Sequence, residues 1–403
     1  MNFEVIKRGH VKRNILIGVV VVLILSAIIL TFTKAKYRVT QSIPLVGGTI
    51  NYTLADLNIV AMYLDGEPID ILPDGNYELT SESYCTNAEN IKDESITLSY
   101  DGDTKTFTVT PFNKKGTKCY LYFNKKVSAV DTIISQVGVE QGDGMLVEEE
   151  GYRYQGTDPN NYIYFNCDDY NNQSSDTCET WRIIGVFDSS SHGIDAQLLK
   201  IINYSSNYGS YTWSSNGNND WNTSTLQVDL NTNYLNRIND YATSGIKDTS
   251  RDLIEDAIWY LGYIDDQNGD IAKVTANVAY NFERNTTETW TGKIGLMYTS
   301  DYGYSALVSS CSRETSLENY GNCSSWLQHK RYGQDSGVHE WLITPSYIKD
   351  QVYSITYYGY VRYYYVGYSG SIDLYRPTLY LKEDLIIKAG DGSMSNPYQL
   401  QLT

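Results

Sequence analysis

The chain has 403 residues, of which 41% are hydrophobic, so it can bury real cores and is not a disordered acidic tail. Its formal net charge is −17, and after residue 38 acidic residues outnumber basic ones roughly two to one. Such a charge repels phosphate backbones, which excludes nucleic acid as an expected partner, and it disfavours lying flat on anionic lipid.

The first predicted element is a transmembrane helix. Residues 15–32 carry no charge, which is long enough to span a bilayer, and basic residues precede the run. The run is long for a signal-peptide core, and no small-residue cleavage site follows it. We therefore expect a cytoplasmic basic segment at 1–14, a transmembrane helix at 15–33 and an extracellular remainder, with the cell membrane as a partner.

Six cysteines follow the apolar run as three near pairs, which are Cys85 with Cys119, Cys167 with Cys178, and Cys311 with Cys323. Fifteen connectivities are possible, and proximity favours pairing within each near pair. An even count behind a membrane span indicates disulfides in an oxidising exterior, whereas the alternative is six reduced thiols. No CxxC motif and no histidine at zinc spacing is present, so neither a metal nor a cofactor is expected.

Residues 38–128 predict a small all-β domain. Short runs of strand-forming residues alternate with turn signals such as Asp65-Gly66 and Asp101-Gly102, and the pattern of residues 96–112 favours a hairpin. A Cys85–Cys119 bridge would tie two strands of an immunoglobulin-like β-sandwich. We interpret this domain as a spacer, and residues 129–149 as a linker with a short helix at Val130–Val137.

Residues 150–388 predict an α+β domain, followed by a C-terminal tail at 389–403. Apolar spacing predicts helices at Thr225–Ile238 and Ser250–Leu261, the second with Gly262 as its stop. Short strands surround them, at Trp181–Phe187, Ala196–Ile202, Lys293–Tyr298, Trp341–Thr344, Val352–Thr356, Val361–Val366 and Thr378–Leu381. Two helices among many short strands define the expected fold class, α+β.

Six segments of this region form a recognisable series, which is YRYQG at 152–156, PNNY at 159–162, WRIIGVF at 181–187, GKIGLMYTSDYGY at 292–304, WLITPS at 341–346 and YRPTLYL at 375–381. In this order they resemble a family of anchored surface proteins from low-GC Gram-positive bacteria. Their closing order is similar to the C-type-lectin-like fold shared with formylglycine-generating enzymes, although Tyr375 stands where a small apolar residue is expected. The resemblance covers about 240 of the 403 residues, and it implies a lectin-like C-terminal domain.

The resemblance does not carry an activity with it. The formylglycine-generating enzymes need a reactive cysteine pair near the end of the domain, and here no cysteine follows Cys323. The Glu-Pro-Asn and Trp-Asn-Asp blocks of calcium-dependent lectins are also missing. His339-Glu340 lacks the second histidine of a zinc-protease motif.

Residues 352–376 hold the predicted ligand surface. Nine of these twenty-five residues are tyrosines, among the 38 of the whole chain, and alternation along a strand places aromatic rings on both faces. One core cannot take them all, so some should be exposed as a surface that resembles a paratope in composition. The alternative is a tyrosine-rich sheet that only packs against loops. The candidate residues are Tyr353, Tyr357, Tyr358, Tyr360, Arg362, Tyr363, Tyr364, Tyr365 and Tyr368.

These observations favour a membrane-anchored extracellular binding protein, not an enzyme, which recognises a glycan or protein ligand through the tyrosine-rich surface. Two alternatives remain at this point. One is a glycan-active hydrolase with an unrecognised carboxylate pair, since the many acidic residues single out no spacing. The other is a surface protein that only associates with itself.

Overall fold

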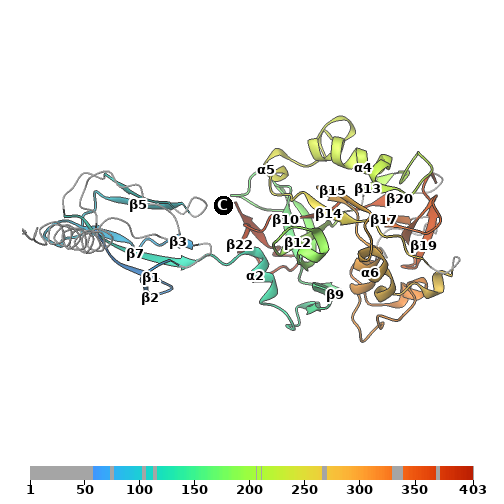
Figure 1. The fold of residues 1–403 in the computed structure, drawn as a ribbon, viewed down its shortest axis with the longest axis horizontal. Helices are drawn as coiled ribbons and strands as arrows, with labels where there is room; N and C mark the ends of the chain where they lie inside the picture. The colour runs from blue at the N-terminus through green and yellow to red at the C-terminus, as the bar shows by residue number, and fades with distance from the viewer. Residues whose placement is uncertain are drawn as a thin grey trace, which may run out of the picture. The chain divides into compact units, whose positions relative to one another are not determined.

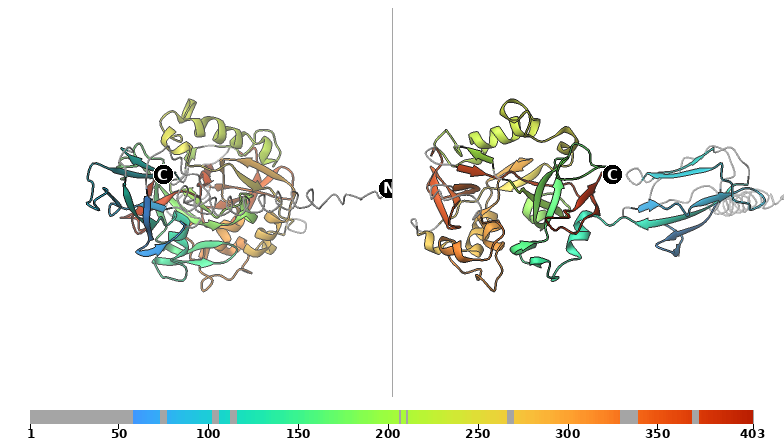
Figure 2. Two further views of the ribbon diagram at one scale, coloured as in Figure 1. Left: turned by 60° about the vertical axis from the view of Figure 1, so that its left-hand side comes forward. Right: turned by 180° about the vertical axis from the view of Figure 1, so that it is seen from behind.

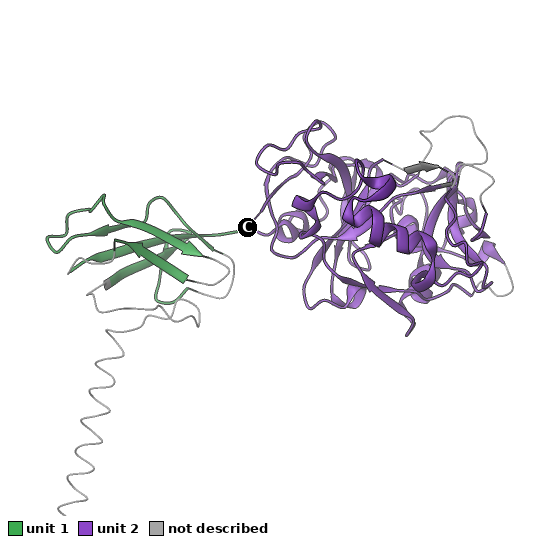
Figure 3. Ribbon diagram, turned by 90° about the horizontal axis from the view of Figure 1, so that it is seen from above, with its two compact units in different colours: residues 1–126 green, residues 127–403 purple. Residues whose placement is uncertain are grey.

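The chain forms two compact units, residues 1–126 and residues 127–403, each described here by itself (Figure 3). The structure is a computed structural model, and it describes residues 58–72, 77–101, 106–111, 116–205, 207–209, 211–265, 270–328, 339–368 and 373–402. The predicted basic segment 1–14 and transmembrane helix 15–33 lie outside these residues. Across the described ranges, no helix has the length and apolar character needed to cross a membrane.

Unit 1, in its described part, consists of strands. They are β1 (Asn58–Leu64), β2 (Glu67–Ile69), β3 (Tyr77–Leu79), β4 (Tyr84–Thr86), β5 (Thr97–Asp101), β6 (Thr106–Thr110) and β7 (Lys118–Lys125). One sheet has the order β2-β1-β7-β3, with β4 also paired to β7, and β5 and β6 form the predicted hairpin. β1 and β7 are parallel, and the other pairs are antiparallel.

The core of unit 1 follows from strand alternation. β6 and β7 bury every second side chain, with Phe107 and Val109 on one and Leu121 and Phe123 on the other. Tyr100 of β5 meets Phe123 edge-on, with ring centroids 5.1 Å apart, which joins the hairpin to the sheet.

Unit 2 contains two large sheets that occupy different halves of the unit in Figure 1 and in the rear view of Figure 2. The first sheet has the order β16-β21-β12-β11-β9-β8, with β10 also paired to β11. Its strands are β8 (Gly142–Glu148), β9 (Tyr152–Pro159), β10 (Tyr162–Phe165), β11 (Glu179–Phe187), β12 (Leu198–Asn203), β16 (Ile294–Gly295) and β21 (Thr378–Tyr380). All six side chains of β12 are buried, so both faces of this central strand are covered.

The second sheet has the order β13-β20-β17-β18-β19, and only β17 and β20 are parallel. Its strands are β13 (Asn207–Gly209), β20 (Asp373–Tyr375), β17 (His339–Pro345), β18 (Gln351–Thr356) and β19 (Val361–Tyr365). Two smaller ladders join β14 (Ala257–Tyr260) to β15 (Thr289–Gly292) and β22 (Ile386–Ala389) to β23 (Gln399–Gln401).

The helices of unit 2 are short. They are α2 (Ala129–Ile134), α3 (Ser189–His192), η1 (Trp221–Thr223), α4 (Thr225–Asp229), η2 (Leu230–Tyr234), η3 (Asn239–Tyr241), α5 (Asp248–Arg251), η4 (Ile271–Lys273), α6 (Ala276–Arg284), α7 (Thr299–Tyr304) and η5 (Leu317–Asn322). The predicted helix Thr225–Ile238 exists as α4 and the π-helical η2, capped by Ser224. It buries Leu226, Leu230 and Tyr234, whereas Ile238 is exposed.

The second predicted helix, Ser250–Leu261, is wrong. Helix α5 ends at Arg251, and Ala257–Tyr260 form β14, whose side chains alternate between buried and half-buried. Trp259 faces Trp290 across this ladder. Gly262 passes so close to Phe282 that a Cβ would collide with its carbonyl oxygen, so this glycine serves packing and not a helix stop.

The predicted fold class, an α+β lectin-like domain with two helices and many short strands, is therefore wrong, because the described residues form mostly strands with few helices. Strand residues outnumber helical ones, and the longest α-helix in the described ranges, α6, has nine residues. The Tyr, Thr, Asn, Ser and Gly content of unit 2 explains this, because these residues disfavour helices and favour strands or turns.

Both ends of unit 2 are structured where a linker and a tail were expected. Within 129–149, α2 buries Ala129, Val130 and Ile133, and β8 pairs with β9. Within 389–403, β23 buries Leu400. The Leu400 carbonyl accepts a hydrogen bond from the side-chain amide of Gln173 at 2.5 Å, and the Leu400 backbone amide donates to the side-chain oxygen of Gln173 at 3.0 Å. Neither segment is a free connector.

Candidate functional site

The nine predicted ligand-binding residues fall on or beside the β18–β19 hairpin, at the edge of the second sheet (Figure 1). Among the described strands, β19 pairs with β18 alone. Tyr358, Tyr365 and Tyr368 are exposed, at 52%, 48% and 39%. The half-buried members are Tyr357, Tyr360, Arg362, Tyr363 and Tyr364. Tyr353 is fully buried, so the prediction that it belongs to a surface is wrong.

Strand register divides these residues between two faces. Tyr353 lies opposite Tyr363, and Ser354 lies opposite Arg362, so each pair shares a face. Tyr363 meets the buried Tyr353 edge-on, with centroids 6.3 Å apart, which makes Tyr363 a packing residue. Arg362 and Tyr364 point to the opposite face. We call Tyr357, Tyr358, Tyr360, Arg362, Tyr364 and Tyr368 the tyrosine edge.

The hairpin turn is supported from two distant parts of the chain. Gly359 has a φ of +78°, a conformation that favours glycine, and its carbonyl accepts a 2.7 Å hydrogen bond from the Tyr302 hydroxyl. Gly321 of η5 lies against the turn, and a Cβ there would collide with the carbonyl oxygen of Tyr358. These contacts hold the tip of the hairpin in one position.

The loop that supplies Gly321 is closed by the Cys311–Cys323 disulfide. The Tyr320 hydroxyl of this loop donates to the carbonyl of Gly303, and the Gln328 side chain donates to the carbonyls of Tyr320 and Cys323 at 2.8 and 2.9 Å. The loop between Cys311 and Cys323 is therefore fixed by a disulfide and by hydrogen bonds beside the tyrosine edge.

Arg362 is fixed within the edge and its charge is paired. Its guanidinium lies 3.2 Å from the carboxylate of Glu318, with both side chains about one-third exposed. It also donates to the carbonyl of Val361 at 3.0 Å and lies 5.6 Å from the ring centre of Tyr360. The arginine therefore orders the edge rather than presenting a free positive charge.

The rings of the edge form two groups. At the turn, Tyr358 and Tyr360 are 6.1 Å apart and tilted by 31°, with Tyr357 perpendicular to Tyr358. At the other end, Tyr364 and Tyr368 are 6.4 Å apart and tilted by 42°. His339 lies 3.9 Å from Tyr364, and burial lowers the pKa of His339 to about 4, so it is neutral at physiological pH.

A separate cluster of charges lies inside unit 2. The Asp301 carboxylate accepts from Arg153 at 2.9 Å and from Lys200 at 2.5 Å, and all three side chains are covered. Burial opposes ionisation of Asp301, but the charges of Lys200 and Arg153 outweigh it and lower the pKa of the carboxyl to about 2. Burial lowers the pKa of Lys200 to about 8. Because the cluster is enclosed, we assign it to stability.

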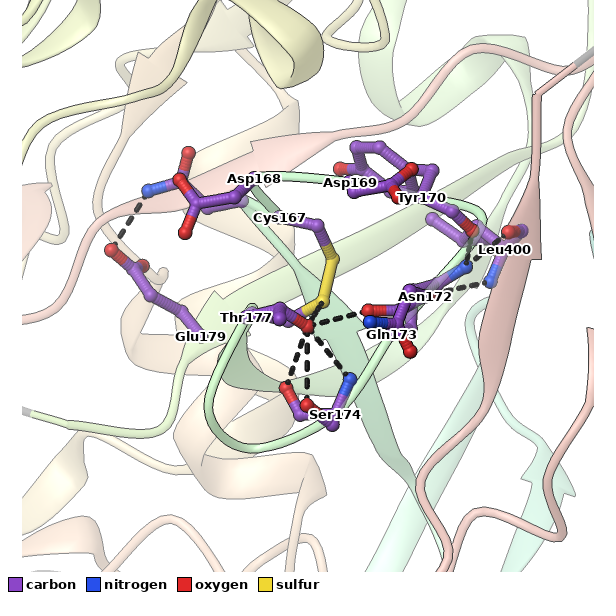
Figure 4. The surroundings of a disulfide bond; sticks show 12 residues. Cys167, Asp168, Asp169, Tyr170, Asn172, Gln173, Ser174, Thr177, Glu179 and Leu400 are labelled. Carbon is purple, nitrogen blue, oxygen red and sulfur yellow. Dashed lines mark hydrogen bonds between the residues drawn. A yellow bond between two sulfur atoms is a disulfide. The ribbon is translucent and has the colours of Figure 1, made fainter.

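The Cys167–Cys178 disulfide closes another polar region, shown in Figure 4. Thr177 donates from its hydroxyl to the carbonyl of Asn172 at 2.7 Å inside the loop. Beside it, the Glu179 carboxylate accepts from Asn166 at 2.7 Å and from Trp181 at 3.0 Å. Burial raises the pKa of Glu179, and its bonds explain it as part of the scaffold.

All three disulfides predicted from proximity are confirmed, with Cys85–Cys119 in unit 1 and the other two in unit 2. They indicate an oxidising, extracellular environment. Over the described ranges, no three His, Cys, Asp or Glu side chains are grouped to hold a metal ion.

The sequence alone did not indicate Glu318, Gly321 or Gln328 as neighbours of the tyrosines. They reach the hairpin through contacts between parts of the chain about forty residues apart. The near pair Cys311 and Cys323 marks a compact loop, but nothing in its spacing tells where that loop packs.

No protein-family model, curated protein or solved structure matches this chain. The resemblance to anchored surface proteins of Gram-positive bacteria therefore stays a prediction.

Proposed function

We propose that the protein is an extracellular binding protein that recognises its ligand through the tyrosine edge of unit 2, without turnover. The observation that carries the proposal is the exposure of Tyr358 before and Tyr368 after the edge strand β19, whose turn with β18 contacts Tyr302 and Gly321. Tyrosine combines an apolar ring with a hydroxyl and loses little side-chain entropy on binding, so rigid exposed tyrosines are efficient contact residues.

The preorganisation of the edge supports the proposal. The Tyr302 hydroxyl, the Gly321 backbone and the Glu318–Arg362 ion pair all act on the turn and the first residues of β19. A surface held in its binding geometry avoids most of the ordering cost of association. A tyrosine-rich sheet that served only packing would not need rings at the solvent boundary.

Attachment to the membrane is part of the same proposal. It rests on the uncharged run at 15–32 of the sequence, together with the disulfides, which favour a location outside the cytoplasm for the rest of the chain. Alkaline extraction of membranes from cells that express the full chain tests it. Retention in the membrane pellet supports an anchor, and release into the supernatant contradicts one.

The test of recognition compares cells that display the full chain with cells that display a variant, using arrays of glycans and proteins. The variant is Tyr358→Ser with Tyr364→Ser, which removes one ring from each end of the edge. The matched control is Tyr263→Ser, which removes a tyrosine that is 57% exposed elsewhere on unit 2. We expect the edge variant to lose the ligands that the control retains, and equal binding by all three contradicts the proposal.

A further inference from the structure

The backbone of β19 is poorly suited to pair with a further strand. Hydrogen bonds from Thr356 to the Tyr360 carbonyl and from Val366 to Asp350 set the register, so residues 361, 363 and 365 direct their backbone groups away from β18. The Arg362 side chain donates a hydrogen bond to the carbonyl of Val361 at 3.0 Å, and the backbone amide of Tyr368 donates to the carbonyl of Tyr365 at 3.0 Å. An extended peptide that adds as a strand would find the outward carbonyls of Val361 and Tyr365 already bonded.

The charge of the tyrosine edge also disfavours strongly charged ligands. Arg362 is the one charged member of the tyrosine edge, and Glu318 neutralises it at 3.2 Å. The chain as a whole is acidic, with a net charge of −17. A polyanion would meet overall repulsion and no unpaired cation on the edge, and a strongly cationic partner would find Glu318 already paired.

The tyrosine edge presents two groups of aromatic rings with polar side chains beside them. Tyr358 and Tyr360 at the turn and Tyr364 and Tyr368 at the far end lie on either side of Arg362, which shares a strand face with Tyr364. Residues 360 and 364, one from each ring group, are about 13 Å apart along an extended strand. Next to the turn, η5 presents the exposed side chains of Asn319 and Asn322. Rings that stack, with amides that hydrogen-bond, suit the faces and hydroxyls of sugars.

We infer that the tyrosine edge binds an uncharged polysaccharide chain that lies along the Arg362 face of β19 and spans several sugar units. This inference rests on the proposed function and adds the ligand's chemistry. A single sugar covers only one of the two ring groups, so affinity increases with chain length until both groups are occupied. Stacking needs an aromatic ring and not a hydroxyl, so Tyr358→Phe and Tyr358→Trp bind as well as the natural protein.

The experiment is calorimetric titration of the purified full chain with cellohexaose, maltoheptaose, chitohexaose and mannohexaose, their monosaccharides, and heparin as a polyanion. We expect at least one neutral oligosaccharide to bind, its monosaccharide to bind at least about tenfold more weakly, and heparin not to compete. Tyr358→Ser and Tyr364→Ser each weaken binding about tenfold or more, whereas Tyr263→Ser leaves it unchanged. Thermal unfolding of each variant verifies that it is folded.

The possible failures are distinct. If no neutral oligosaccharide of the panel binds, or heparin binds best, the polysaccharide inference is wrong, while a protein ligand lost by the same tyrosine variants keeps the proposed function. If a neutral oligosaccharide binds the natural protein and the Tyr358→Ser and Tyr364→Ser variants equally, both the inference and the proposed function are wrong.

Discussion

At the residue scale, Asp301 has the largest structural role that we can assign to one side chain. Its carboxylate pairs with two buried cations, Arg153 and Lys200, and accepts a 3.0 Å hydrogen bond from the backbone amide of Tyr298 at the start of helix α7. Lys200 stands among the rings of Phe187, Trp259, Tyr298 and Tyr380, where an unpaired ammonium would be very costly.

Asp301→Asn should therefore lower the free energy of unfolding by about 3–5 kcal/mol, because it leaves Lys200 and Arg153 buried without a countercharge. Urea unfolding followed by tyrosine and tryptophan fluorescence measures this loss. The matched control is Asp248→Asn, which breaks the exposed pair with Arg251 and should change stability little. A loss as small as the control's would contradict the role given to the cluster.

The same carboxyl predicts an acid-sensitive step in stability. The pKa of Asp301 is lowered to about 2 in the folded chain, below its ordinary value of 3.8, so its contribution is full above pH 4 and is lost as pH falls toward 2. The stability difference between the natural protein and Asp301→Asn should shrink over this interval. A difference that stays constant from pH 5 to pH 2 would show that Asp301 does not titrate as described.

The tyrosines show what could be read from the sequence at this scale. Alternation correctly predicts that both faces of the 352–376 ribbon carry rings, and that one core does not take them all. Alternation does not tell which face of the ribbon is buried, because Tyr353 and Tyr358 both have other tyrosines close by in the sequence. Tyr353 is enclosed because it belongs to the hydrophobic core of unit 2, which brings together residues far apart in the chain.

At the scale of elements, the loop closed by Cys311 and Cys323 links stability to recognition. Replacing both cysteines by serine should lower the stability of unit 2 by about 3 kcal/mol and weaken ligand binding, because Gly321 and Glu318 lose their fixed position beside the hairpin. The control is the double replacement of Cys85 and Cys119 in unit 1, which should leave ligand binding unchanged. Equal binding by both disulfide variants would remove the loop from the account.

The C-terminal ladder of β22 and β23 supplies a second test of an element. Ending the chain after Asn396 removes Tyr398 and Leu400, both buried, and should destabilise unit 2 by more than about 3 kcal/mol. Ending it after Gln401 removes only the exposed Leu402 and the last residue, and should have little effect. Thermal unfolding compares the two, and equal melting temperatures would mean that the ladder is dispensable.

Predictions of elements succeeded where periodicity was unambiguous. The strands expected at 181–187, 352–356 and 361–366 correspond to β11, β18 and β19. The predicted helix at 250–261 failed because Leu253, Ile254, Ala257, Ile258 and Leu261 fit a helical stripe, while the pairing of Trp259 with Trp290 was invisible along the chain. Tertiary pairing overrode the local pattern there.

At the scale of the whole molecule, composition predicted separate compact units but not the class of the larger one. The boundary between the units falls at residue 126, close to the end of the expected spacer, because the apolar pattern of unit 1 ends with β7. The segments 129–149 and 389–403 read as polar connectors, although their few apolar residues enter the core of unit 2. A few buried side chains in a polar segment give too weak a signal to identify such elements.

The central claim is that the hairpin of β18 and β19 turns tyrosine rings outward, and chemical labelling measures this directly. The folded full chain is iodinated under mild conditions, and each tyrosine is located by mass spectrometry, with Tyr263 as the exposed reference and Tyr353 as the buried one. The account predicts that Tyr358 and Tyr368 react as readily as Tyr263 while Tyr353 stays unlabelled. Labelling of Tyr353 together with protection of Tyr358 and Tyr368 would contradict it.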